Sequence, residues 1–190
     1  MSKTLEVLTK AFIGESQARN KYTFYASIAK KEGLIQIADV FTVTANQEKE
    51  HASQLFKMIQ SLKGDANSIE VGSEVSFTLG DTKENLKAAM DGEAFEKDSM
   101  YPEFAKIAEE EGHADIAAKL KCIAVAENHH YERFAKLLKV LEDGSIFRKD
   151  KQVVWVCAEC GYVYIGEEAP KVCPCCGHPQ GYYYLMNEEY

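Results

Sequence analysis

Two Glu-x-x-His motifs stand out in this 190-residue chain, one ending at His51 and the other at His130. Residues three positions apart share one face of a helix, so each motif presents a carboxylate and an imidazole to the same point. Further glutamates lie on the two other expected helices, at heights within ~6 Å of the motifs. The full candidate set is Glu15, Glu48, His51, Glu93, Glu96, Glu127 and His130.

These seven side chains interrupt the apolar stripes of their helices, so we expect them to point into a core. Burying ions without countercharge is strongly unfavourable. Two ferric ions would offset the five carboxylates and leave room for a bridging oxide or hydroxide. Carboxylates combined with imidazoles suit iron or manganese better than thiophilic metals. The pattern therefore predicts a dinuclear metal centre with room for a bridging oxo or hydroxo group.

The third helix carries two inward-facing acids, Glu93 and Glu96, where such a site needs only one. A surplus ligand would let one ion change partners with its oxidation state, because carboxylate favours the ferric ion and imidazole the ferrous ion. We expect His51 and Glu96 to be the pair that exchanges. The alternative is that Glu96 lies beside the ligands without binding metal.

A second group of candidate ligands consists of two Cys-x-x-Cys pairs near the end of the chain. The first residues lack the apolar run of a secretion signal, and clustered cysteines are then typical of a metal site. Four thiolates predict a tetrahedral centre, and their spacing suits zinc as well as iron. The expected ligands are Cys157, Cys160, Cys173 and Cys176, while the role of Cys175 stays open.

The elements that must position these residues can be read from periodicity. Apolar residues recur every three or four positions in four stretches of residues 1–142, which predicts four amphipathic helices. Short turns at Gly33 and Gly112 make antiparallel pairs, and residues 65–80 can run the length of a bundle. Pro102 should kink the third helix. We therefore expect a mainly α, ferritin-like four-helix bundle with one long crossover.

Helical periodicity ends near residue 142. We expect residues 143–152 to be a linker and residues 153–190 to be a small domain of short β-strands. The net charge of −8 argues against nucleic acid binding. No window holds the ~18 unbroken apolar residues of a membrane span.

The run from Cys157 to Tyr164, together with Cys173 to Gly177, resembles rubredoxin, in which four thiolates hold one iron. A di-iron bundle followed by such a domain resembles the rubrerythrin family over essentially the whole chain. This resemblance implies a cytoplasmic peroxidase that reduces hydrogen peroxide to water and protects against oxidative stress. It also implies that electrons come from NAD(P)H through a separate donor protein, such as a rubredoxin or an NAD(P)H oxidoreductase.

The resemblance further assigns roles to individual side chains. Two carboxylates would bridge the irons, and each iron would take one further carboxylate and one histidine, with Glu96 able to replace His51. Two tyrosines would stand beside the irons and, with His51 and Glu96, take part in catalysis. In this order the residues are Glu48 and Glu127 as bridges, Glu15 with His51, Glu93 with His130, and the tyrosines Tyr22 and Tyr101.

The fourth helix ends ~22 Å beyond Glu127, so the small domain starts far from the paired metals of its own chain. We therefore expect a head-to-tail homodimer in which each small domain serves the other bundle. Two alternatives remain open. One is a ferroxidase or iron-storage protein with the same helical site, and the other is a zinc-ribbon interaction module on a metal-stabilised bundle.

Overall fold

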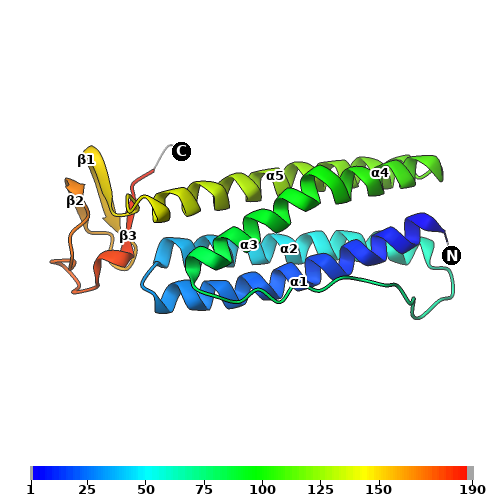
Figure 1. The fold of residues 1–190 in the computed structure, drawn as a ribbon, viewed down its shortest axis with the longest axis horizontal. Helices are drawn as coiled ribbons and strands as arrows, with labels where there is room; N and C mark the ends of the chain where they lie inside the picture. Colours follow the sequence, from blue (N-terminus) through cyan, green and yellow to red (C-terminus); the bar gives the residue numbers. More distant parts are fainter. Residues whose placement is uncertain (1, 188–190) are drawn as a thin grey trace.

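Four helical rods and a small β-sheet make up the structure, a computed structural model that describes residues 2–187 (Figure 1). Helix α1 (Lys3–Lys31) begins after Ser2, whose hydroxyl accepts a backbone N–H of the first turn. Gly33 has a φ of 76°, which lets the chain reverse into α2 (Ile35–Leu62). The first two rods are therefore antiparallel neighbours, as expected.

The third rod is continuous but irregular. It consists of α3 (Thr82–Phe95), the π-helical turn η1 (Glu96–Met100) and α4 (Tyr101–Glu110). Pro102 lies in the first turn of α4 and has no N–H to donate to the preceding turn. The irregularity expected at Pro102 is thus a wider helical turn just before it. Helix α5 (Ala114–Glu142) completes the bundle.

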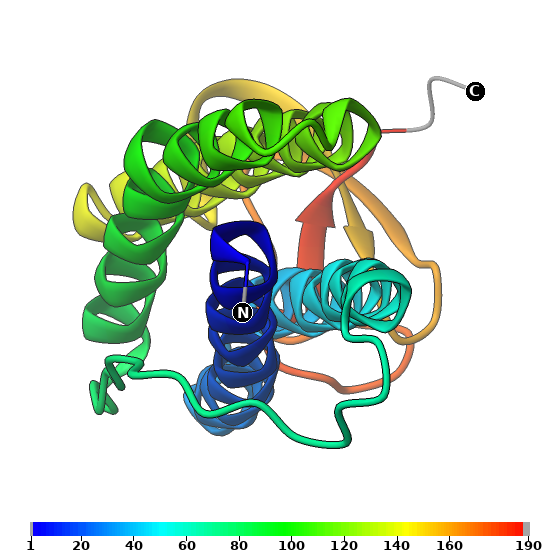
Figure 2. The same cartoon turned by 90° about the vertical axis from the view of Figure 1, so that its right-hand side faces the viewer.

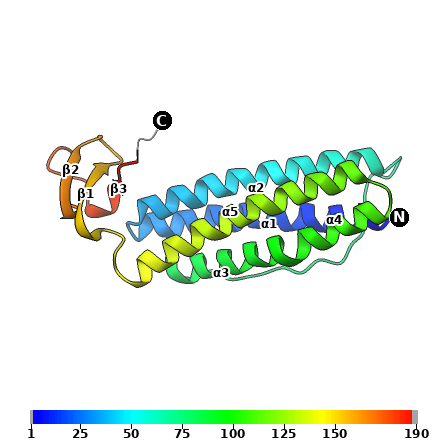
Figure 3. The same ribbon diagram turned by 90° about the horizontal axis from the view of Figure 1, so that it is seen from above.

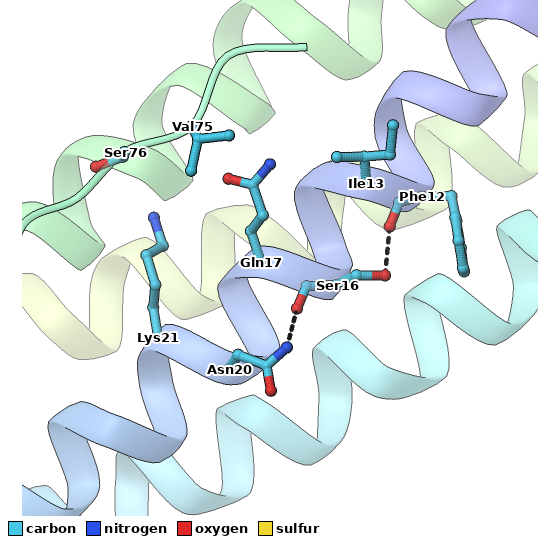
Figure 4. A pocket seen from close by; sticks show the side chains of 8 residues that line it. All are labelled: Phe12, Ile13, Ser16, Gln17, Asn20, Lys21, Val75 and Ser76. Atoms are coloured by element: carbon cyan, nitrogen blue, oxygen red, sulfur yellow. Dashed lines mark hydrogen bonds between the residues drawn. The ribbon is translucent and has the colours of Figure 1, made fainter. Parts of the chain in front are cut away.

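The connection between α2 and α3 crosses from one end of the bundle to the other, as the sequence predicts (Figures 1 and 2). It lies along α1, where Val75 and Ser76 stand opposite Gln17 and Lys21 (Figure 4). Gln17 Nε2 donates a hydrogen bond of 3.3 Å to the backbone carbonyl of Glu74. We call this connection, residues 63–81, the crossover. It covers part of the surface of α1.

Two apolar clusters fill the bundle, one on either side of a band of buried charge. A spacing of seven residues is close to two helical turns, so it keeps residues on one face of a helix. The order along α1 is Leu8, Glu15, Tyr22, and along α5 it is Leu120, Glu127, Phe134. The acidic band is therefore held between two ordinary hydrophobic cores.

The small domain lies at the end of the bundle away from the N-terminus (Figure 3). Its antiparallel sheet has the order β2-β1-β3, formed by β1 (Arg148–Cys157), β2 (Val163–Glu168) and β3 (Tyr183–Leu185). The core of this domain includes Trp155, whose indole N–H donates to the Gly166 carbonyl at 3.0 Å.

The first strand begins earlier than the sequence suggested. β1 starts at Arg148, which pairs with Glu168, so residues 148–152 of the expected linker 143–152 are part of the strand. The register shifts between Arg148 and Val153, and the intervening residues are mostly exposed and charged. Such a strand lacks the apolar alternation by which strands are recognised in a sequence.

The small domain packs directly on the turn between α1 and α2. A Cβ atom at Gly181, in the 3₁₀ turn η2 (Gln180–Tyr182), would lie 1.7 Å from the carbonyl oxygen of Gly33. Only glycine permits this approach. The Tyr184 hydroxyl also makes a hydrogen bond to the carboxylate of Asp39 in α2. Within residues 2–187, no helix is long and apolar enough to cross a membrane.

Candidate metal centres

The rods bring most of the candidate acids and both histidines together inside the bundle. Potential ligand atoms fall into two groups of four, and within each group all four atoms lie within 4.8 Å of one another. Glu48 and Glu127 belong to both groups. The first group is Glu15, Glu48, His51 and Glu127, and the second is Glu48, Glu93, Glu127 and His130.

The two shared carboxylates divide their oxygens between the two halves of the site. Glu127 places Oε1 at 2.8 Å from His51 Nδ1 and Oε2 at 2.8 Å from His130 Nδ1. Glu48 places Oε2 at 3.0 Å from His51 Nδ1 and Oε1 at 3.0 Å from His130 Nδ1. A carboxylate that offers one oxygen to each of two centres has the arrangement of a bridging ligand.

The chemistry of this site calls for cations. Glu15, Glu48, Glu93 and Glu127 are each at most 1% exposed. The histidine–carboxylate contacts are short, but none of them meets the geometry of a hydrogen bond. Within the described residues, these buried atoms have no hydrogen-bond partner: Glu15 Oε2, both carboxylate oxygens of Glu48 and of Glu127, Glu93 Oε2, and Nδ1 of His51 and of His130. Buried polar atoms are rarely left unpaired, so the donor set fits a pair of iron or manganese ions.

Glu96 lies outside both groups. Its side chain points toward Gly14 of α1, where an added Cβ would be 3.9 Å from Glu96 Oε1. Burial, with Glu15 nearby, raises the pKa of Glu96 well above its usual value. Glu96 also opens the π-helical turn, and such turns occur frequently at functional sites. Of the two residues expected to exchange, the structure therefore places His51 among the ligands and Glu96 beside them.

Both expected tyrosines contact ligand carboxylates. Tyr22 donates its hydroxyl to Glu93 Oε1 at 2.5 Å, and Tyr101 donates its hydroxyl to Glu15 Oε1. Burial raises the pKa of both phenols well above 10, so both remain protonated donors. Each half of the site thus has its own buried hydroxyl.

Sequence reasoning missed a cation next to the site. Arg133 donates to Thr44 Oγ1 at 2.7 Å and to Gln47 Oε1 at 2.9 Å. Arg133 follows His130 by three positions, and Thr44 precedes Glu48 by four, so both lie one helical turn from a ligand. That spacing is the signal that could have revealed this pair.

The four expected cysteines also converge. Sγ of Cys157 lies 3.8 Å from that of Cys176, and Sγ of Cys160 lies 3.7 Å from that of Cys173. All four sulfur atoms lie within 4.8 Å of one another, as tetrahedral coordination requires. Cys175 is exposed and belongs to no such group among the described residues.

One thiol of this group is already prone to ionise. Burial opposes ionisation of Cys173, but the Tyr183 hydroxyl and the backbone N–H groups of Cys176 and Cys175 lower its pKa to about 6. Thiolates rather than thiols bind metal. The fold therefore favours the ligand form at this position.

Without metal, the acidic band should make folding strongly pH dependent. Burial, together with Glu127 and Glu48, raises the pKa of Glu15 from 4.5 to about 8 despite the opposing contact with His51. A raised carboxyl pKa makes the folded state less favourable as pH rises from 4.5 to 8. Burial opposes protonation of His130, but the neighbouring carboxylates raise the pKa of His130 from 6.5 to about 11. The stability from His130 is complete below pH 6.5 and is lost as pH rises toward 11, so both groups act in the same direction.

We therefore predict that the free energy of unfolding of the metal-free protein falls by a few kcal/mol between about pH 5 and about pH 8. Urea unfolding of chelator-treated protein across this range measures it. Glu15→Gln should make the profile less steep, because the amide does not titrate and only the other groups, such as His130, still contribute. A flat profile for the unsubstituted metal-free protein would contradict the buried positions of these acids.

Comparisons with known proteins agree with this architecture. The sequence model of the rubrerythrin family matches residues 6–138, and that of the rubrerythrin rubredoxin-like domain matches residues 155–184. A protein described as a putative rubrerythrin from Methanocaldococcus jannaschii is 53% identical over 100% of this chain and 96% of its own length. Rubrerythrin-1 of Clostridium acetobutylicum is 48% identical, over 100% of this chain and 97% of its own.

Solved structures show the same fold. Nigerythrin in a mixed-valence state is 28% identical with a TM-score of 0.64, and the match covers 98% of this chain and 88% of nigerythrin. A bacterioferritin of Mycobacterium tuberculosis, at 20% identity and a TM-score of 0.65, covers 75% of this chain and 90% of its own. This second likeness shows the ferritin-like fold alone.

Proposed function

The chain belongs to the rubrerythrin family of oxidoreductases, with a di-iron site in its bundle and a rubredoxin-like four-cysteine site. From this premise we propose that the protein reduces hydrogen peroxide to water. The observation that carries the proposal is the sharing of Glu48 and Glu127 between two ligand groups inside a dry core. When bound, a ferrous pair supplies the two electrons that peroxide reduction consumes, and the iron of the four-cysteine site passes electrons one at a time.

The ligand assignment follows the two groups. We propose that the shared carboxylates bridge the ions and that each half adds its own acid and histidine. The residues are Glu48 and Glu127 as bridges, Glu15 with His51 in one half, and Glu93 with His130 in the other. In the small domain we propose Cys157, Cys160, Cys173 and Cys176 as ligands of one iron.

Reduction of one peroxide molecule to two water molecules also consumes two protons. Tyr22 and Tyr101 are placed to hold them, since each keeps its hydroxyl proton and donates it toward one half of the site. We propose that both tyrosines orient the ligands by these hydrogen bonds and relay protons at their hydroxyl oxygens.

We also propose that His51 and Glu96 alternate as ligands. The side chain of His51 is 14% exposed, whereas that of His130 is 2% exposed, so His51 is the histidine with room to move. Glu96 lies beside the ligand groups at the start of a π-helical turn, and it would bind as the carboxylate that the ferric ion favours.

Electrons would enter through the small domain. We propose the bundle, residues 1–142, and the small domain, which begins with β1 at Arg148, as the two functional units. A separate donor protein, such as a rubredoxin or an NAD(P)H oxidoreductase, would be the redox partner. The small domain packs beyond the α1–α2 turn, at the end of its own bundle. We therefore propose a head-to-tail homodimer in which each small domain serves the partner's bundle. The family supports a cytoplasmic location.

Anaerobic stopped-flow mixing tests the reaction. Fully reduced, iron-loaded protein should be reoxidised much faster by hydrogen peroxide than by oxygen, with two water molecules formed per peroxide. The reverse order of rates would favour the alternative, a ferroxidase or iron-storage protein. A colourless four-cysteine site that holds zinc after anaerobic purification would favour the other alternative, a zinc-ribbon interaction module.

A further inference from the structure

A cavity of about 420 Å³ lies between the crossover and the paired-metal site. Its inner wall includes Glu96 and also Tyr22, which donates a hydrogen bond to the ligand carboxylate of Glu93. A water molecule occupies ~30 Å³ in the liquid, so this space holds peroxide together with several waters. The cavity therefore connects the surface beside α1 with the edge of the metal site.

Two glycines open this space from inside helices. Gly14 of α1 and Gly92 of α3 both line the cavity. A glycine inside a helix is destabilising relative to alanine, so its use needs a reason. An added Cβ at Gly92 would meet no atom within 4 Å, and one at Gly14 would meet only Glu96 Oε1, at 3.9 Å. Side chains larger than a methyl group at these positions would occupy the cavity.

The crossover forms the outer wall of the same cavity. Its residues Gly72, Ser73, Glu74 and Ser76 all line the space, and the Gln17 side chain holds the backbone of Glu74. These residues carry small or polar side chains and are mostly exposed. The outer wall of the cavity is therefore a single solvent-exposed segment of chain, and the opposite wall is formed by residues beside the metal site.

We propose that this cavity is the route by which peroxide reaches the metal site, and that Gly14 and Gly92 set the size of the ligand that can pass. The inference rests on the proposed function, because it names the path of the substrate for that reaction. Glu96 and Tyr22 form the inner end of the route. Small ligands pass, and a side chain that fills the space closes the route.

The test uses azide as a small probe of the oxidised, iron-loaded protein, followed by the absorption change on binding. An obstructed route slows association and dissociation by the same factor and leaves Kd unchanged, whereas a damaged site changes Kd. Gly92→Leu should slow both rates by at least about tenfold. Gly92→Ala should slow them less, because its methyl group meets open space.

Ala88→Leu is the matched control. Ala88 precedes Gly92 by one helical turn and lines the neighbouring groove, but it does not line the cavity. It receives the same side chain on the same helix and should leave the azide rates unchanged. Gly14→Leu closes the route from the opposite helix, so the test survives if one variant folds poorly.

Unchanged azide association in both leucine variants would overturn the route and assign access to the partly exposed edge of His51. A change in Kd with unchanged association would overturn it as well. These outcomes are separate from the proposed function. A protein that fails to reduce peroxide can still show the azide effect, and an active peroxidase can lack it.

Discussion

Replacing Glu127 with alanine is expected to empty both metal positions of the bundle at once. Glu127 offers one oxygen to each half of the site, and both oxygens are buried without a hydrogen-bond partner in the described part of the chain. Loss of this bridge removes a ligand from both ions. It also leaves His51 and His130 without the acid that each contacts at 2.8 Å.

Peroxide turnover of Glu127→Ala should fall by more than the roughly 100-fold that loss of a supporting residue can cost at a metal site. Metal analysis after anaerobic purification should find only the iron of the four-cysteine site. Glu132→Ala is the control, because Glu132 is exposed on the same helix and is absent from both ligand groups. Two retained ions per bundle in Glu127→Ala would show that the carboxylate does not bridge.

The second large effect is expected in the small domain. Cys160→Ser removes one of four converging sulfur atoms and should abolish the colour of the thiolate-bound iron. Turnover driven by NAD(P)H through a donor protein should fall by at least about 100-fold, comparable to the loss of a metal ligand's support. A single oxidation of chemically reduced protein by one equivalent of peroxide should keep its rate, because the bundle is untouched.

Cys175→Ser supplies the control for this variant. Cys175 is two residues from Cys173 but exposed and outside the sulfur group, so its loss should change neither the colour nor the turnover. If the rate of the single oxidation step in Cys160→Ser fell as much as the donor-driven turnover, the two sites would not act separately. Unchanged donor-driven turnover would show that electrons bypass the small domain.

The same two variants test which bundle each small domain serves. A heterodimer of Glu127→Ala with Cys160→Ser contains one intact bundle and one intact small domain, on different chains. If each small domain serves the partner's bundle, this heterodimer recovers about half of the normal turnover. Service within one chain predicts no recovery above the two parent variants.

Sequence reasoning predicted which acids and histidines converge in the bundle because helical geometry is regular. A spacing of three residues fixes the helix face on which a side chain lies, and its distance in sequence from Gly33 or Gly112 fixes its height along the bundle. These two quantities suffice to predict the members of both ligand groups. The cysteine group followed from spacing and chemistry in the same way. The family resemblance added the bridging roles and the tyrosines.

Features that depend on contacts between distant segments were not accessible in this way. Glu96 lies outside the ligand groups and begins a π-helical turn, and such a turn has no simple sequence period. The approach of Gly181 to Gly33 joins residues 148 positions apart, and nothing local to either one signals it. The start of β1 at Arg148 was hidden by a charged run that pairs with the end of β2.

Anomalous X-ray diffraction at the iron edge, from crystals of the anaerobically purified protein, tests the central claim most directly. The account predicts two peaks inside the bundle, both contacted by Glu48 and Glu127, with one beside His51 or Glu96 and the other beside His130. A third peak should lie among the four cysteines. A bundle with one peak or none, and with these carboxylates turned toward solvent, would contradict it.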